Sequence, residues 1–446
     1  MLYLLCDFQS TRLDYILNIV FDRILQTEYT LLSWEAYQQG IAIKDDTPHV
    51  VMYYGEKPGA GQFFIPDSGL LRENRIREEA PVLLEQAGRL PQLFFQEELQ
   101  LKPTEGVTHD LLASCFFLIT QYERYQHPTT GTHGRYDEVA YDSYTRKWHH
   151  HPLVQLLAEE LWQQLLQLEP KLSRIHRRTS LHLTFDVDHP WKYWFRGFFV
   201  NAGGLLKHTF QLRFQVVGEM LKALFSGSDP YNTYPLIHRH FPPEHTAFFF
   251  LLDRTTPQDG WHTYKNRPYR KLVKGLKEKG YGIGLHPSYA TYLNPERIKF
   301  ERERLNRLVL EDSEHSRQHF LRYRLPETFR FLLEAGIRHD YTLAMYTDRG
   351  FPTGMALSYP WFDLGKNEAT ELMLHPTTVM DRSLKDYQGL GVDEAMTQCR
   401  ELWKEVDTVN GCFRILLHNN TLSDEGEWEG WRMPILNLVE ELTSSL

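Results

Sequence analysis

Apolar residues in the first part of the chain recur at the spacing of helices, with one short strand between them. One helix face is formed by Leu13, Ile16, Leu17, Val20 and Phe21, which follow the period of an α-helix. The run from His49 to Tyr54 is typical of a strand, and further helices are predicted over residues 110–122 and 153–165. Pro170 follows the last of these helices. We therefore predict an N-terminal α/β domain over residues 1–170.

From about residue 178 the pattern changes to strands that alternate with helices. Strands are predicted over residues 181–185, 246–252, 281–285 and 412–417. Helices are predicted over residues 271–279, 327–335 and 394–409, and another begins at Pro295 after an Asn294 cap. Such alternation is typical of βαβ units and of a parallel sheet or barrel. A second domain is therefore predicted over residues 178–446.

Composition narrows the class of protein. The 446 residues are 42% hydrophobic and 24% charged, which is typical of a packed globular chain. The net charge of −9 disfavours nucleic acid as a partner, because that binding needs a positive field. The four cysteines are scattered, which favours a reducing compartment. We see no signal peptide and no run of about 18 apolar residues, so we expect a cytoplasmic protein or one on the inner face of a membrane.

Two aspartates at the end of the first predicted strand are the leading candidates for chemistry. Asp186 and Asp188 are two residues apart, so their side chains share one face of the strand. Active sites of barrels collect at this end of the strands. Two carboxylates so close together repel each other unless a cation or a proton relieves the charge. The alternative is an Asp-rich turn, which is about equally compatible with the sequence.

Three more residues lie at or near the ends of predicted strands. His286 follows the strand 281–285 and is a residue type that suits zinc, although a lone histidine is more often structural. His418 follows the strand 412–417 and could protonate a leaving amine, or simply bond to nearby backbone. Arg317 could hold a carboxylate by a forked hydrogen bond, or form a surface ion pair.

The order Asp186, Asp188, His286, Arg317 and His418 resembles the five motifs of the polysaccharide deacetylases of carbohydrate esterase family 4. The resemblance implies a distorted (β/α) barrel and a divalent metal, usually zinc, that together remove acetyl groups from an N-acetylated saccharide substrate. It implies that Asp186 is the catalytic base, that Asp188 and His286 bind the metal, that Arg317 orients the base and that His418 is the general acid.

The whole chain also resembles large bacterial members of that family that carry an N-terminal domain of unknown function. The segments that carry this likeness are Leu90–Phe95, Tyr122–Tyr125 and His133–Tyr136.

One motif departs from the family pattern. The family's second motif has two metal-binding histidines four residues apart, whereas the residue four after His286 is Ala290. Substitutes for the missing ligand are Ser288, Thr291, His319, His189 or water. The alternative function is a barrel that has lost its metal and its activity, and that binds a glycan or a protein.

Several other signals lead to weaker expectations. Residues 192–213 mix basic and aromatic side chains, which is compatible with contact to a membrane surface or a lid, although packing between domains is favoured. The tract His149–His151 is interpreted as a solvated run. Asp363 and Asp381 are expected in exposed loops without a clear role.

Overall fold

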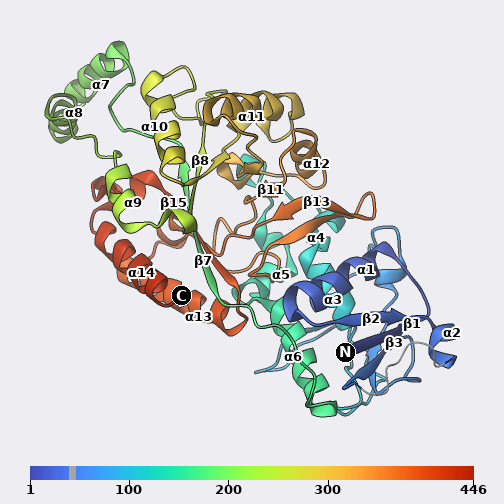
Figure 1. The fold of residues 1–446 in the computed structure, drawn as a ribbon. Helices are drawn as coiled ribbons and strands as arrows, with labels where there is room; N and C mark the ends of the chain where they lie inside the picture. Colours follow the sequence, from blue (N-terminus) through green and yellow to red (C-terminus); the bar gives the residue numbers. More distant parts are fainter. Residues whose placement is uncertain (40–46) are drawn as a thin grey trace.

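The computed structural model describes residues 1–39 and 47–446 and shows a mixed α/β protein built on two larger sheets, with a third sheet of only two strands, β5 (Leu83–Leu84) and β6 (Gln92–Leu93) (Figure 1). The larger sheet has nine strands in the order β12-β13-β11-β10-β9-β8-β7-β15-β14. In that order the strands are β12 (Tyr359–Asp363), β13 (Glu368–Leu374), β11 (His339–Asp340), β10 (His315–Ser316), β9 (Gly282–Leu285), β8 (Thr246–Phe250), β7 (Ser180–Val187), β15 (Cys412–His418) and β14 (Val379–Met380).

All neighbouring strands of this sheet are parallel except β12 and β13, which are antiparallel. The predicted α/β class with a parallel sheet is therefore confirmed. Within the described residues no pairing joins the edge strands β12 and β14, so closure into a barrel stays a prediction.

Helices cover the sheet because its central strands are apolar on both faces. Phe248, Phe249 and Phe250 of β8 are all fully buried, as expected for a parallel sheet that is covered on both sides. Contacts with the sheet come from α10 and α11 at β9, from α12 at β13 and from α13 at β15. The helices of this part are α7 (Phe198–Phe210), α8 (Phe214–Ser226), α9 (Tyr234–His240), α10 (Arg267–Glu278), α11 (Pro295–Val309), α12 (Glu327–Glu334), α13 (Val392–Thr408) and α14 (Arg432–Ser444).

The N-terminal part of the chain, up to Pro170, contains a smaller parallel sheet with helices packed on it. Its strands, in the order β2-β1-β3-β4, are β2 (Tyr29–Leu32), β1 (Leu2–Cys6), β3 (Val50–Gly55) and β4 (Phe63–Pro66). The main helices are α1 (Thr11–Leu17), α3 (Leu111–Ile119) and α6 (Leu153–Leu168). Strand β1 was not predicted, because its short apolar run has no local feature that distinguishes a strand from a helix.

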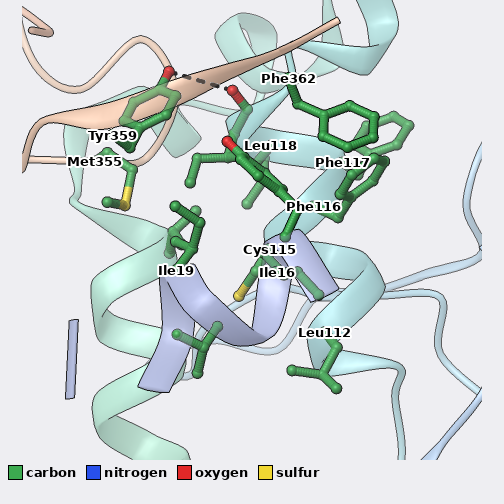
Figure 2. Packing of buried hydrophobic residues seen from close by; sticks show 14 of the residues in the cluster. Ile16, Ile19, Leu112, Cys115, Phe116, Phe117, Leu118, Met355, Tyr359 and Phe362 are labelled. Carbon is green, nitrogen blue, oxygen red and sulfur yellow. Dashed lines mark hydrogen bonds between the residues drawn. The ribbon is translucent and has the colours of Figure 1, made fainter. Parts of the chain in front are cut away.

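A single buried cluster joins this smaller sheet to the larger one (Figure 2). Phe362 of β12 lies 5.1 Å from Phe116 of α3 and 4.9 Å from Tyr15 of α1, measured between ring centroids. The hydroxyl of Tyr359 donates a hydrogen bond to the carbonyl of Ile119 at 3.3 Å. Residues 1–170 and 178–446 therefore share a buried core. The division of the chain into two domains at this boundary stays a prediction.

Helices α7 and α8 form a hairpin that projects from the rest of the molecule (Figure 1). Residue Phe199 of α7 is 87% exposed, and no residue of α7 is buried. The favoured interpretation of residues 192–213 as packing between domains is therefore wrong for the part that forms α7, because α7 packs mainly on α8. No helix in the described ranges combines the length and the apolar character that crossing a membrane requires.

Candidate metal centre and catalytic site

The five predicted site residues lie at one end of the larger sheet. Asp186 on β7 is directly opposite His418 on β15. Asp188, His286 and Arg317 follow the last residues of β7, β9 and β10. Because these strands are parallel, their carboxyl ends meet at the same edge, where α/β sheets bind ligands. The tertiary structure thus gathers side chains that are distant from one another in the sequence.

Asp188, His286 and His319 form a group that could hold a metal ion. The Oδ1 atom of Asp188 lies 3.3 Å from Nε2 of His286 and 3.6 Å from Nε2 of His319. The two imidazole rings are 5.0 Å apart between centroids. One carboxylate oxygen and two imidazole nitrogens therefore face a common point, and this is a ligand set that zinc accepts.

Contacts behind the two histidines orient their free nitrogens toward that point. Nδ1 of His286 lies 2.5 Å from the carbonyl oxygen of Arg317, and Nδ1 of His319 lies 3.1 Å from Oδ1 of Asp259. In the neutral form of each ring, Nδ1–H donates to its acceptor and the lone pair of Nε2 faces Asp188. Metal-binding histidines typically have such a carbonyl or carboxylate behind them.

The residues present therefore fit a divalent cation. Oδ1 of Asp188 is buried and accepts no hydrogen bond from the described residues, although two imidazole nitrogens are nearby. A buried carboxylate oxygen without a donor is costly, and a cation would satisfy it. His319 fits as the third ligand better than two of the predicted substitutes: the hydroxyl of Ser288 donates to Glu301, and that of Thr291 donates to a backbone carbonyl.

The electrostatics of the group follow from its charges. Burial would raise the pKa of Asp188, but the imidazoles of His319 and His286 hold it well below its usual range. Burial would lower the pKa of His319, but the carboxylates of Asp188 and Asp259 outweigh burial and raise it to about 9. A positive charge is thus strongly favoured beside Asp188, whether it is a proton or a metal ion.

Asp186 is held by an arginine that is itself completely buried. Nη1 of Arg317 donates to Oδ1 of Asp186 at 3.0 Å, and Nε donates to the carbonyl of Tyr341 at 3.0 Å. Nη2 of Arg317 donates to the hydroxyl of Thr377 at 3.2 Å. This network fixes Asp186 in position, with its second oxygen, Oδ2, 3.7 Å from Nε2 of His286.

His418 has an aspartate partner that the sequence interpretation placed wrongly. Asp381, expected in an exposed loop, is buried, and its Oδ1 lies 2.9 Å from Nδ1 of His418. Nε2 of His418 points the other way and lies 3.9 Å from Oδ2 of Asp188. Burial opposes a charge on the ring, but the carboxylates, Asp381 first, raise the pKa of His418 to about 9. Asp363 was also expected to be exposed, but it is buried in an ion pair with Arg330.

We predict that an Asp381→Asn variant will lose about 10- to 100-fold in the catalytic turnover proposed below. The amide cannot supply the negative charge that raises the pKa of His418, so a smaller fraction of His418 is protonated at neutral pH while the metal ligands are untouched. The measurement is kcat/KM for acetate release, together with zinc content. Full activity at normal zinc content would show that Asp381 does not act through His418.

These groups open into one cavity of about 220 Å³. Its apolar wall includes Leu321, Met380 and Leu416, which form a small buried cluster. The lining residues are Arg135, Asp186, Asp188, His286, His319, Phe320, Leu321, Met380, Arg382, Asp386, Tyr387, Leu416 and His418. Arg135 is the lining residue that comes from the N-terminal part of the chain, so this part of the protein reaches the site.

A second group with metal-binding residue types lies elsewhere, at His149, His150 and Asp348. Here Nε2 of both histidines lies 3.0 Å from Oδ2 of Asp348. These distances are those of direct charge-assisted hydrogen bonds, so Asp348 is already satisfied, unlike Asp188. The expectation of a solvated run is wrong for His149, which is buried in this ion-pair cluster.

The sequence interpretation missed Asp381, Asp259 and Arg135, and left His319 as one of several substitute ligands. His319 lies two residues after Arg317, just past the end of β10, which pairs with β9. No strand was predicted there, so spacing did not single it out from the other substitutes. Asp259 and Asp381 lie outside the matched motifs, and Arg135 lies in the other part of the chain.

Comparisons with known proteins found one family model and several distantly similar solved structures. The model of a family of unknown function (DUF7033) matches residues 2–170. Among solved structures, a candidate polysaccharide deacetylase from Mycobacterium smegmatis is 14% identical, with a TM-score of 0.39, over 60% of this chain and 85% of that chain. The Puue allantoinase is 12% identical, with a TM-score of 0.40, over 60% and 85%. A probable polysaccharide deacetylase from Pseudomonas aeruginosa PAO1 is 13% identical, with a TM-score of 0.39, over 60% and 86%.

No curated protein matches the chain. The likenesses to solved structures are too distant to assign an activity, so the function is inferred from the site itself.

Proposed function

We propose that this protein is a metal-dependent hydrolase that removes N-acetyl groups from a saccharide or a glycan precursor. The observation that carries the proposal is the convergence of Asp188, His286 and His319 on one point. Two separate hydrogen-bonded pairs, Asp186–Arg317 and His418–Asp381, lie beside that point. The proposal takes the nine-stranded sheet and its helices, over residues 178–446, as the distorted (β/α) barrel that the family resemblance implies.

Asp188, His286 and His319 would hold the metal, with zinc as the leading candidate, and it would supply Lewis acidity toward the acetamide carbonyl and a lowered pKa for water. Asp186 accepts the proton of the water that adds to the carbonyl carbon, while Arg317 holds its carboxylate in place. His418 donates a proton to the nitrogen as the C–N bond breaks, which releases acetate and a free amine. Its raised pKa keeps His418 protonated at neutral pH, as this role requires.

The test is acetate release from N-acetylated oligosaccharides by purified protein, before and after chelation. We expect release that is lost on chelation and restored by one equivalent of zinc. If zinc-loaded protein releases no acetate from any N-acetylated saccharide, the hydrolase proposal is wrong. Saturable binding of the same saccharides without release would then support the alternative, a barrel that binds glycans without hydrolysing them.

A further inference from the structure

The cavity contains a buried arginine that has no anionic partner. Arg135 is 7% exposed, and among the described residues no carboxylate lies within ion-pair distance of it. Its Nη1 donates to the hydroxyl of Tyr387 at 3.2 Å, whereas its Nε is buried with no acceptor. The other arginine of the cavity lining, Arg382, has Asp386 and Glu427 as partners, each at 2.9 Å.

Aromatic faces surround Arg135 where an anion would be expected. Its guanidinium carbon lies 4.5 Å from the ring centroid of Tyr346 and 5.5 Å from that of Phe320. Cation–π contacts offset part of the cost of burying the charge, but they give the buried Nε–H no acceptor. A desolvated guanidinium of this kind binds a carboxylate or phosphate strongly, because two parallel hydrogen bonds can form.

The loop that carries Arg135 is locked onto the larger sheet. Nδ1 of His133 lies 2.8 Å from the hydroxyl of Tyr289, and Nε of Arg322 donates to the carbonyl of His133 at 2.6 Å. Gly134 has a φ of +70°, and a Cβ there would lie 3.2 Å from the hydroxyl of Tyr292. The position of Arg135 in the cavity is therefore built into the contact between the two parts of the chain.

We propose that Arg135 is a specificity residue that binds an anionic group, a carboxylate or a phosphate, on the saccharide substrate. This proposal rests on the proposed function for the identity of the site, and it narrows the substrate class to acidic or phosphorylated N-acetylated sugars. It also assigns a role to the N-terminal part of the chain, which supplies the residue that recognises the charge.

The test is calorimetric titration of zinc-loaded protein with three sugars: N-acetylglucosamine, its 6-phosphate and N-acetylmuramic acid. We expect at least one charged sugar to bind about tenfold or more tightly than the neutral sugar. Comparison of the 6-phosphate with N-acetylmuramic acid shows whether Arg135 binds a phosphate or a carboxylate. An Arg135→Met variant should lose that preference, and Arg135→Lys should retain part of it.

Arg124 provides a matched control. Its guanidinium also lies over aromatic rings, 4.9 Å from Tyr136 and 5.5 Å from Tyr323, but it does not line the cavity. An Arg124→Met variant should keep the preference for charged sugars. Equal affinity of the unaltered protein for charged and neutral sugars, or a preference that survives Arg135→Met, would overturn the proposal. The titrations are repeated with the zinc-loaded Asp186→Asn protein, in which hydrolysis is slowed, so that binding is measured apart from turnover. A failure of the hydrolase proposal would be seen separately, as absent acetate release by the unaltered protein.

A second, independent observation concerns the hairpin of α7 and α8. Most of its large apolar side chains face solvent instead of a core: Phe198, Phe210 and Phe225 are each 79% exposed or more. Other exposed apolar residues of the hairpin are Val200, Leu206, Leu212, Phe214 and Leu221. Exposed apolar surface gathered on one element marks an interaction site, and Figure 1 shows this element projecting from the body.

The charge of the hairpin favours one kind of partner. Residues 195–227 contain Arg196, Lys207, Arg213 and Lys222 but only one acidic residue, Glu219. This segment is therefore basic on a chain whose net charge is −9. Aromatic and basic residues on short helices are typical of segments that lie in the interface of an anionic membrane. We infer that the hairpin docks on an anionic lipid surface. The first helix of the hairpin, α7, begins at Phe198, ten residues after Asp188 in the chain.

Cosedimentation with lipid vesicles tests this inference. The full-length protein should bind vesicles that contain phosphatidylglycerol, and bind phosphatidylcholine vesicles at least about tenfold more weakly. A Phe198→Ser, Phe199→Ser double variant and a Lys207→Glu, Arg213→Glu double variant should each lose binding. Ile175→Ser, at a residue that is 72% exposed outside the hairpin, is the control and should bind normally.

Two outcomes would overturn the membrane inference. One is equal sedimentation of the unaltered protein with and without anionic vesicles. The other is a dimer in analytical ultracentrifugation that the Phe198→Ser, Phe199→Ser variant abolishes, because the hairpin would then bind a second copy of the chain.

Discussion

An Asp186→Asn variant is expected to release acetate from N-acetylated saccharides about 10²- to 10⁴-fold more slowly than the unaltered protein. The amide has almost the same shape as the carboxylate, and its oxygen can still accept the hydrogen bond from Arg317. It cannot accept a proton from water, so the variant removes the base while it keeps the network around it. Initial rates of acetate release at saturating and at low substrate measure the loss in kcat and in kcat/KM.

The same substitution at a neighbouring buried carboxylate serves as the control. Asp340 ends β11 and bonds to the hydroxyls of Ser316 and Thr342, outside the cavity. An Asp340→Asn variant should keep its rate within a few-fold. Zinc content should be unchanged in both variants. An Asp186→Asn protein with a normal rate would show that another group takes the proton.

The second large effect is expected from His319→Ala. If His319 is the third ligand, its loss should weaken zinc binding by more than about 100-fold, because removal of a group that merely orients a ligand already costs about 10- to 100-fold. Metal content after dialysis against a zinc buffer measures the change directly, and acetate release should fall in parallel. His286→Ala should show the same loss.

His189 is the matched control for this prediction. It is a partly buried imidazole next to Asp188, its Nδ1 has no hydrogen-bond partner among the described residues, and it was one of the candidate substitutes for the missing ligand. Burial lowers the pKa of His189 to about 4, so it is a neutral histidine like a true ligand. Full zinc content in His319→Ala combined with zinc loss in His189→Ala would reverse the assignment.

The sequence by itself predicted the α/β class of the fold, which the structure confirms, and the strand ends that carry the candidate site residues. The period of apolar residues separates the strands at residues 180–187, 246–250, 282–285 and 412–418 from the helices between them, because period and length are local properties. A polar residue directly after a buried strand is visible in the same way. Asp186, Asp188, His286 and His418 were therefore identified before their positions in space were known.

Only the tertiary structure decided which side chains complete the site. His319 becomes a ligand candidate because β10 lies beside β9, and Asp381 becomes the partner of His418 because β14 lies beside β15. Arg135 reaches the cavity through packing between the two sheets, across a core shared by residues far apart in the chain. Strand order and packing depend on long-range contacts that no local pattern encodes, so these assignments could not be made from periodicity or spacing.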